Sequence, residues 1–194
     1  MKSVVILGAV ILGLIVAVSG CNTQRKFVTL DTQVENAWAN VQSAYQRRAD
    51  LVPNLVATVK GAANFEQQTL TGVAEARAKA TSIQVDPANL TPEKLAEFQQ
   101  AQSGLSQAIG RLLMVTESYP ELRATDSFKE LQSQLEGTEN RIKVERDKYN
   151  ATVAEYNSGV RKFPANFWAG IFGFERKTPF QADQSAQNAP KVEF

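Results

Sequence analysis

The feature that most constrains this chain is a seam of apolar residues, spaced alternately three and four apart, that runs through most of its length. In the first stretch the seam comprises Val34, Trp38, Val41, Tyr45, Val52, Leu55 and Val59, with Arg48 at the missing position. Comparable seams continue over residues 62–83, 95–115 and 128–160. This spacing puts the seam on one side of an α-helix, and no stretch shows the alternation of a half-buried strand. The sequence predicts an all-α fold of long, packed helices.

Residues that flank the seams indicate where the helices begin and end. Capping boxes at Thr32 and Ser127 predict two helix starts, and Thr91 before a proline predicts a third. Pro120 and Pro164 predict the ends of the third and last helices, because proline cannot continue a helix.

The number of helices depends on residues 47–64. One helix over residues 28–83 would leave part of its apolar seam uncovered, which is unfavourable. We therefore expect a break, either near Asp50–Pro53 or at Lys60-Gly61. Either break gives an up-and-down bundle of four antiparallel helices, whereas a kinked first helix gives three.

The first residues have the layout of a secretory signal. Lys2 precedes an apolar run over residues 4–18, which ends in Ser19-Gly20-Cys21. The residues before Cys21 resemble the lipobox of bacterial lipoproteins, in which the cysteine is acylated and the chain is cleaved before it. The alternative is a retained anchor, since residues 3–24 carry no charge and are long enough to span a bilayer. Both alternatives place the body outside the cytoplasm, at a bacterial membrane, with the outer membrane as one destination.

Composition restricts the chemistry. The chain has no histidine and one cysteine, and its 21 Lys and Arg balance 20 Asp and Glu. Lack of histidine excludes Ser-His-Asp and Cys-His catalysis within the chain, and one cysteine cannot form an internal disulfide or a thiolate cluster. The balanced charge does not favour nucleic acid as a partner. We expect no enzyme activity and no cofactor.

Several blocks of sequence, in order, resemble the LemA family of bacterial envelope proteins. They include RRADLVPNLV at residues 47–56, ESYPELRA at 117–124, GTENRI at 137–142 and RDKYN at 146–150. The resemblance extends over residues 27–180. It implies an antiparallel helical bundle in the envelope, with no settled activity, catalytic residue or cofactor. Many family members look like uncleaved N-terminal anchors, so the motif at Cys21 is a departure from the family pattern.

Two polar blocks are the candidate interaction surface. They comprise Arg47, Arg48 and Asp50 in one block, and Glu139, Asn140 and Arg141 in the other. These residues either face a partner or anionic group, or pair with each other inside the bundle, which is the interpretation we favour. Glu117 and Glu121 form a less favoured candidate, an all-carboxylate cation site.

Residues 163–180 are rich in aromatic side chains separated by proline and glycine. One interpretation is a membrane-interface segment whose contacts are Phe167, Trp168, Phe172 and Phe174. The other is a plug across the open end of the bundle. With four helices the segment lies beside the membrane anchor, and with three it lies far from it.

The predicted organisation has five parts. They are a signal or membrane segment (1–20), a lipid-anchored tether (21–27), the bundle (28–163), the aromatic segment (164–180) and a flexible tail (181–194). We expect a non-catalytic scaffold or adaptor for an unidentified envelope protein. A membrane-organising protein acting through the aromatic segment is the alternative, and a carboxylate–metal hydrolase is less favoured. The oligomeric state stays open.

Overall fold

The computed structural model describes residues 2–61, 66–87 and 90–181, and it confirms the predicted all-α fold, with no strand among these residues. Most of the predicted tail, residues 182–194, lies outside the described part. The helices, in chain order, are α1 (Lys2–Lys60), α2 (Gln67–Ser82), α3 (Pro92–Val115), the short 3₁₀ helix η2 (Thr116–Ser118), α4 (Pro120–Ala124), α5 (Asp126–Arg161) and α6 (Ala165–Phe172).

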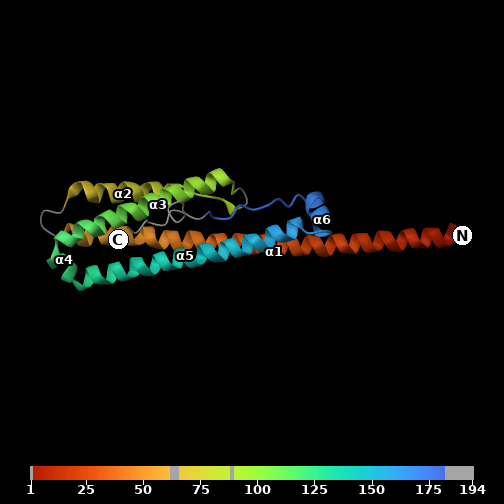
Figure 1. Cartoon of the computed structure of the whole chain (residues 1–194), viewed down its shortest axis with the longest axis horizontal. Helices are drawn as coiled ribbons and strands as arrows, with labels where there is room; N and C mark the ends of the chain where they lie inside the picture. Colours follow the sequence, from red (N-terminus) through yellow and green to blue (C-terminus); the bar gives the residue numbers. More distant parts are fainter. Residues whose placement is uncertain (1, 62–65, 88–89, 182–194) are drawn as a thin grey trace, which may run out of the picture.

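The four long helices form an up-and-down bundle, as Figure 1 shows. Helix α1 packs chiefly against α5, and α2 packs chiefly against α3. The buried side chains form two groups along the bundle axis. The group nearer the N-terminal end of α1 includes Phe27 and Trp38, and the other includes Leu55 and Leu105. The seams predicted from spacing therefore supply the core.

The prediction that the first bundle helix starts at Thr32 is wrong, because helix α1 begins far before this residue. The Thr32 hydroxyl donates to the Val28 carbonyl oxygen at 2.9 Å, the usual bond of a threonine inside a helix. Buried Phe27 and Leu30 continue the apolar seam towards the N-terminus, so packing extends the helix past the capping residue. Residues 21–27 are consequently part of one helix with the bundle.

Pro53 lies inside α1 because another donor replaces the hydrogen bond that it cannot make. Proline has no N–H for the carbonyl four residues earlier, which here belongs to Ala49. Nε of Arg77, on α2, donates to that oxygen at 2.8 Å. The predicted break near Asp50–Pro53 is therefore wrong, and the one at Lys60-Gly61 is confirmed, because α1 ends at Lys60.

The remaining boundaries are partly as predicted. Thr91 caps α3, its Oγ1 accepting from the Lys94 N–H at 3.3 Å. The cap of α5 is Thr125, whose Oγ1 accepts from the Phe128 N–H at 3.4 Å, so the predicted cap at Ser127 is wrong by two residues. The third long helix ends at Val115, earlier than predicted, and η2 and α4 fill the connection.

Helix α6 and the point where α1 leaves the bundle lie at the same end of the bundle (Figure 1). Helix α6 lies beside α1 where the N-terminal part of α1 projects from the bundle (Figure 1). After Gly173, which has a φ of 74°, residues 174–181 run back along α5 and form what we term the C-terminal strap. The projecting part of α1 is long and apolar enough to cross a membrane, a property that signal sequences share.

Candidate functional site

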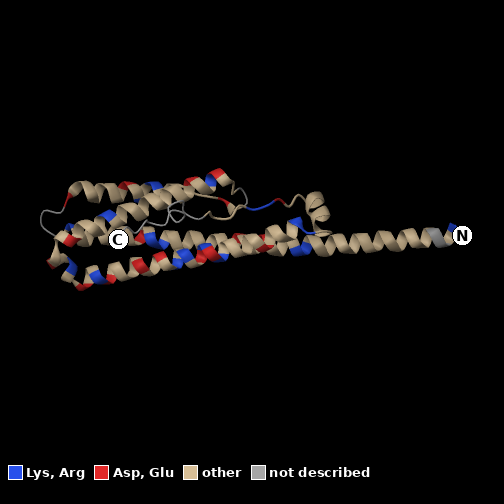
Figure 2. Cartoon of the chain, in the orientation of Figure 1, with Lys and Arg blue, Asp and Glu red and all other residues tan. Residues whose placement is uncertain are grey.

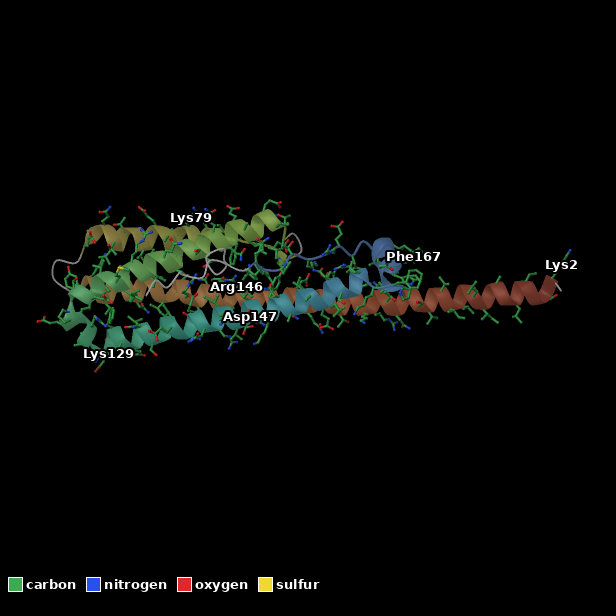
Figure 3. The ribbon with its side chains drawn as sticks, viewed as in Figure 1. Lys2, Lys79, Lys129, Arg146, Asp147 and Phe167 are labelled. Carbon is green, nitrogen blue, oxygen red and sulfur yellow. The ribbon has the colours of Figure 1, made fainter. Side chains whose placement is uncertain are left out.

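Helix α6 is attached to α1 where α1 leaves the bundle. Gly20 is buried, and a Cβ atom there would lie 2.9 Å from Cζ3 of Trp168. Trp168 stacks on Phe172 with a centroid separation of 5.9 Å, and Ala169 is buried in the nearby core. Figure 3 shows Phe167 at this junction. The close contact between the helices thus depends on the missing side chain of Gly20.

The other face of α6 is apolar and open to solvent. The exposed fractions are 86% for Phe163, 61% for Phe167 and 57% for Ile171. These residues are four apart, so Phe167 and Ile171 share one helix face and Phe163 precedes it. Among the residues predicted for membrane contact, Phe167 and Phe172 are exposed. The other two, Trp168 and Phe174, are half-buried.

Aromatic residues of the strap enter the core of the bundle. Phe180 is buried between Trp38, with ring centroids 5.7 Å apart, and Tyr149, at 5.3 Å. Phe174 packs on Phe27 at 5.1 Å. The plug interpretation therefore describes the strap, whereas the exposed face of α6 is covered by no described part of the chain.

Two asparagines of α5 hold the strap by its backbone. The Asn157 amide donates to the Lys177 carbonyl and accepts from the Lys177 N–H, each at 2.8 Å. Asn150 makes the same pair of bonds with Phe180, at 3.2 and 2.8 Å. Lys177 also forms an ion pair of 2.8 Å with Asp31 on α1. The strap is thus fixed to both helices of the α1–α5 pair.

Each of these asparagines follows a buried tyrosine. The Tyr149 hydroxyl donates to the Thr178 carbonyl oxygen at 2.9 Å, and burial raises the pKa of Tyr149. Burial, together with the carboxylates of Asp31 and Glu175, raises the pKa of Tyr156 to about 12. The Tyr-Asn pair thus occurs twice on α5, seven residues apart. In each pair the tyrosine faces the core and the asparagine faces the strap.

Arg48 and Glu139, from the two predicted polar blocks, pair with each other. The Arg48 side chain is only 4% exposed, and its Nη1 lies 2.9 Å from Glu139 Oε2. Its Nη2 donates to the carbonyl and side-chain oxygens of Gln102, both at 3.0 Å. The Gln102 amide donates in turn to the Ala80 carbonyl at 3.1 Å. This network joins all four long helices.

The other residues of the polar blocks are exposed. Arg47 and Arg141 line opposite sides of a surface depression of about 500 Å³ between α1 and α5. Asp50 accepts a hydrogen bond from Gln46 at 2.7 Å, and Asn140 is exposed on α5. The structure therefore separates the predicted surface into buried Arg48, which is paired with exposed Glu139, and an exposed remainder.

Cys21 is exposed on α1, one residue beyond the contact with Trp168. Glu117 lies in η2 and Glu121 in α4. Across residues 2–61, 66–87 and 90–181, no group of three or more acidic or cysteine side chains is placed to hold a metal ion.

Sequence reasoning missed three groups of residues that shape this site. Asn150 and Asn157 carried a detectable signal, since their seven-residue spacing puts both on one helix face. Phe163 and Ile171 lay in the recognised aromatic segment but were not singled out. Glu145 is 2% exposed and paired with Arg141 and Lys148, and it occupies the seam position between Ile142 and Tyr149, a spacing that signals burial.

Comparison with known proteins agrees with the blocks of sequence quoted above. The model of the LemA family matches residues 37–194. This chain belongs to the LemA family. Magnetosome protein MamQ 2 of Paramagnetospirillum magneticum is 28% identical over 183 residues, covering 86% of this chain and 67% of that protein.

Two further relatives place the family in other bacteria. MamQ of Magnetospirillum gryphiswaldense is 27% identical, again over 86% of this chain and 67% of its own. Protein LemA of Metamycoplasma hominis is 26% identical over 78% of this chain and 66% of its own. With the apolar N-terminal helix, this membership indicates a membrane-associated envelope protein of the non-enzymatic type.

Proposed function

We propose that this LemA-family protein is a non-catalytic scaffold or adaptor that holds a partner protein at the extracytoplasmic face of a bacterial membrane. One observation carries the proposal. Helix α1 supplies both the membrane-length apolar segment and the first long helix of the bundle, without a break between them (Figure 1). A bundle joined in this way stands at a fixed angle to its anchor and presents its surface at a fixed distance from the bilayer.

The exposed polar residues between α1 and α5 are the surface we assign to the partner. Arg47 and Arg141 flank the depression there, and their guanidinium groups suit carboxylates of an acidic partner surface. The ion pair between Arg141 and Glu145, 2.8 Å long, positions one of these groups. We also propose lipid attachment at Cys21, in which case cleavage removes residues 1–20 and the acyl chains hold the bundle at the first residue of the remaining helix. Mass spectrometry of the mature N-terminus tests this mode of anchoring, since an intact Met1 would contradict acylation and leave the apolar segment of α1 as the anchor.

Photo-crosslinking in cells tests the adaptor role. A photoreactive amino acid replaces Arg47 or Arg141, and a matched control replaces Lys79, an exposed cation on α2. We expect a stoichiometric protein adduct from positions 47 and 141 and none from position 79. Adducts to lipid alone, or equal adducts from all three positions, would contradict the proposal.

A further inference from the structure

Helix α6 is apolar around its whole circumference. Its sequence, ANFWAGIF, has one polar residue, Asn166. One face, which includes Trp168 and Ala169, packs on the bundle, and the opposite face bears Phe167 and Ile171 without protein against it. A helix that is apolar all round is normally buried on all sides, so the open face requires an apolar covering.

The position of α6 along α1 identifies that covering. Trp168 contacts Gly20, two residues after the apolar run of residues 4–18 ends and one before Cys21. A retained membrane segment leaves the bilayer at this level, and acyl chains attached to Cys21 begin there too. Both modes of anchoring therefore place the open face of α6 at the membrane surface.

The charges around the junction complement a membrane with anionic lipids. Phe27 lies against Gly159, so Arg25 and Lys26 of α1 lie level with the end of α5, where Arg161 and Lys162 follow. These four cations are exposed, and residues 19–30 and 156–174 contain no acidic side chain. Figure 2 shows the basic residues of this end and the uncharged helix beyond them. Cations at this depth attract lipid phosphates.

We propose that α6 is an interfacial helix that inserts Phe163, Phe167 and Ile171 among the lipids of the bilayer that α1 enters. Trp168 holds α6 on α1, and the basic collar of Arg25, Lys26, Arg161 and Lys162 contacts anionic headgroups. The bundle then has two membrane contacts, α1 and α6, which fix its tilt and its rotation about α1. This inference requires membrane anchorage but not a protein partner, so failure of the adaptor role would leave it intact.

Spin labelling of the full-length protein in vesicles of phosphatidylcholine and phosphatidylglycerol tests this assignment. In a Cys21→Ser background, a nitroxide is attached at Phe167→Cys or Ile171→Cys, two positions where the native side chain is more than half exposed. Met114→Cys, 67% exposed at the far end of α3, is the matched control. Collision with oxygen reports lipid contact, and collision with a water-soluble nickel chelate reports contact with water.

We expect labels at positions 167 and 171 to collide with oxygen more often, and with the nickel chelate several-fold less often, than the label at position 114. Nickel accessibility equal to that at position 114 would show α6 in water and overturn the proposal. Protection from both reagents would show protein, such as a second copy, on α6 and would overturn it as well. Circular dichroism of each labelled variant confirms that the bundle is folded.

Discussion

The side-chain amide of Asn157 pairs with both backbone groups of Lys177, donating to its carbonyl and accepting from its N–H, each at 2.8 Å. An amide side chain that matches a peptide unit in this way recognises backbone and not a particular side chain. Asn150 repeats the arrangement at Phe180, two helical turns along α5. The strap is therefore held at two points by its main chain, and at the second point the ring of Phe180 enters the core against Trp38 and Tyr149.

Replacing both asparagines by aspartate should release the strap. Aspartate keeps the shape of asparagine but cannot donate to a carbonyl, and each lost bond costs about 1 kcal/mol. We expect trypsin to cleave after Arg176 and Lys177 faster in Asn150→Asp/Asn157→Asp than in the wild type. Asn140→Asp, on the exposed side of the same helix, is the control and should cleave at the wild-type rate. Equal cleavage of all three proteins would contradict the role of the pair.

Removing Arg48 should be far more damaging than neutralising Glu139. The Arg48 side chain is 4% exposed and that of Glu139 is 61% exposed, so water can replace one partner but not the other. We expect Arg48→Ala to lower the free energy of unfolding by roughly 3 kcal/mol, through lost packing and unpaired polar groups around Gln102. Glu139→Gln should lower it by about 1 kcal/mol or less.

Chemical denaturation of the two variants in the same detergent measures the difference. Arg48→Met is the informative control, because methionine restores apolar packing without the charge. Arg48→Met should therefore recover a large share of the free energy of unfolding that Arg48→Ala loses. If Glu139→Gln were as unstable as Arg48→Ala, the ion pair itself would be the main contribution, against the exposure argument.

The seams of α3 and α5 could be predicted because a buried helix face requires apolar residues at a regular local spacing. Leu95, Leu105, Ile142 and Val153 are buried as their positions in the seams require. The capping box at Thr32 misled because caps report only a local preference, and packing of Phe27 and Leu30 overrides it. The extent of α1 depended on contacts that a short window of sequence does not contain.

The candidate site divides in a similar way. Pairing of Arg48 with Glu139 followed from opposite charges beside two seams, and the structure shows it. The position of the strap could not be predicted from the sequence. The asparagine side chains of α5 bind the backbone of the strap, and backbone groups are the same whatever the strap's sequence. The different roles of Trp168 and Phe167, neighbours in the chain, also depended on which face of α6 meets Gly20.

Stability should fall at alkaline pH through the buried tyrosines. In the unfolded chain a tyrosine loses its proton near pH 10, whereas in the fold the pKa of Tyr156 is about 12, and burial also raises the pKa of Tyr149. Between these values the unfolded state releases protons that the folded state retains. The tyrosine contribution is therefore complete below about pH 10 and is lost as the pH rises through the folded pKa.

Denaturant midpoints measured from about pH 8 to 11 check this dependence, together with tyrosinate absorbance of the native protein. Tyr156→Phe should make the denaturant midpoint fall less steeply with pH, because it removes one titrating group. A native protein whose tyrosines all ionise near pH 10 without unfolding would contradict the burial of these hydroxyl groups. The matching change at Tyr149 would also remove its bond to Thr178, so Tyr156 gives the cleaner comparison.

The bond from Arg77 to the Ala49 carbonyl should matter only while Pro53 is present. In the wild type, Nε of Arg77 supplies the donor, at 2.8 Å, that proline lacks. We expect Arg77→Met to lower the free energy of unfolding by about 1–2 kcal/mol, since a carbonyl in a buried position loses its partner. With Pro53→Ala, the alanine N–H satisfies that carbonyl, and Arg77→Met should cost about 1 kcal/mol less. Thermal or denaturant unfolding of the four proteins in this double-mutant cycle measures the coupling. Additive effects of the two substitutions would mean that α1 tolerates Pro53 without help from α2.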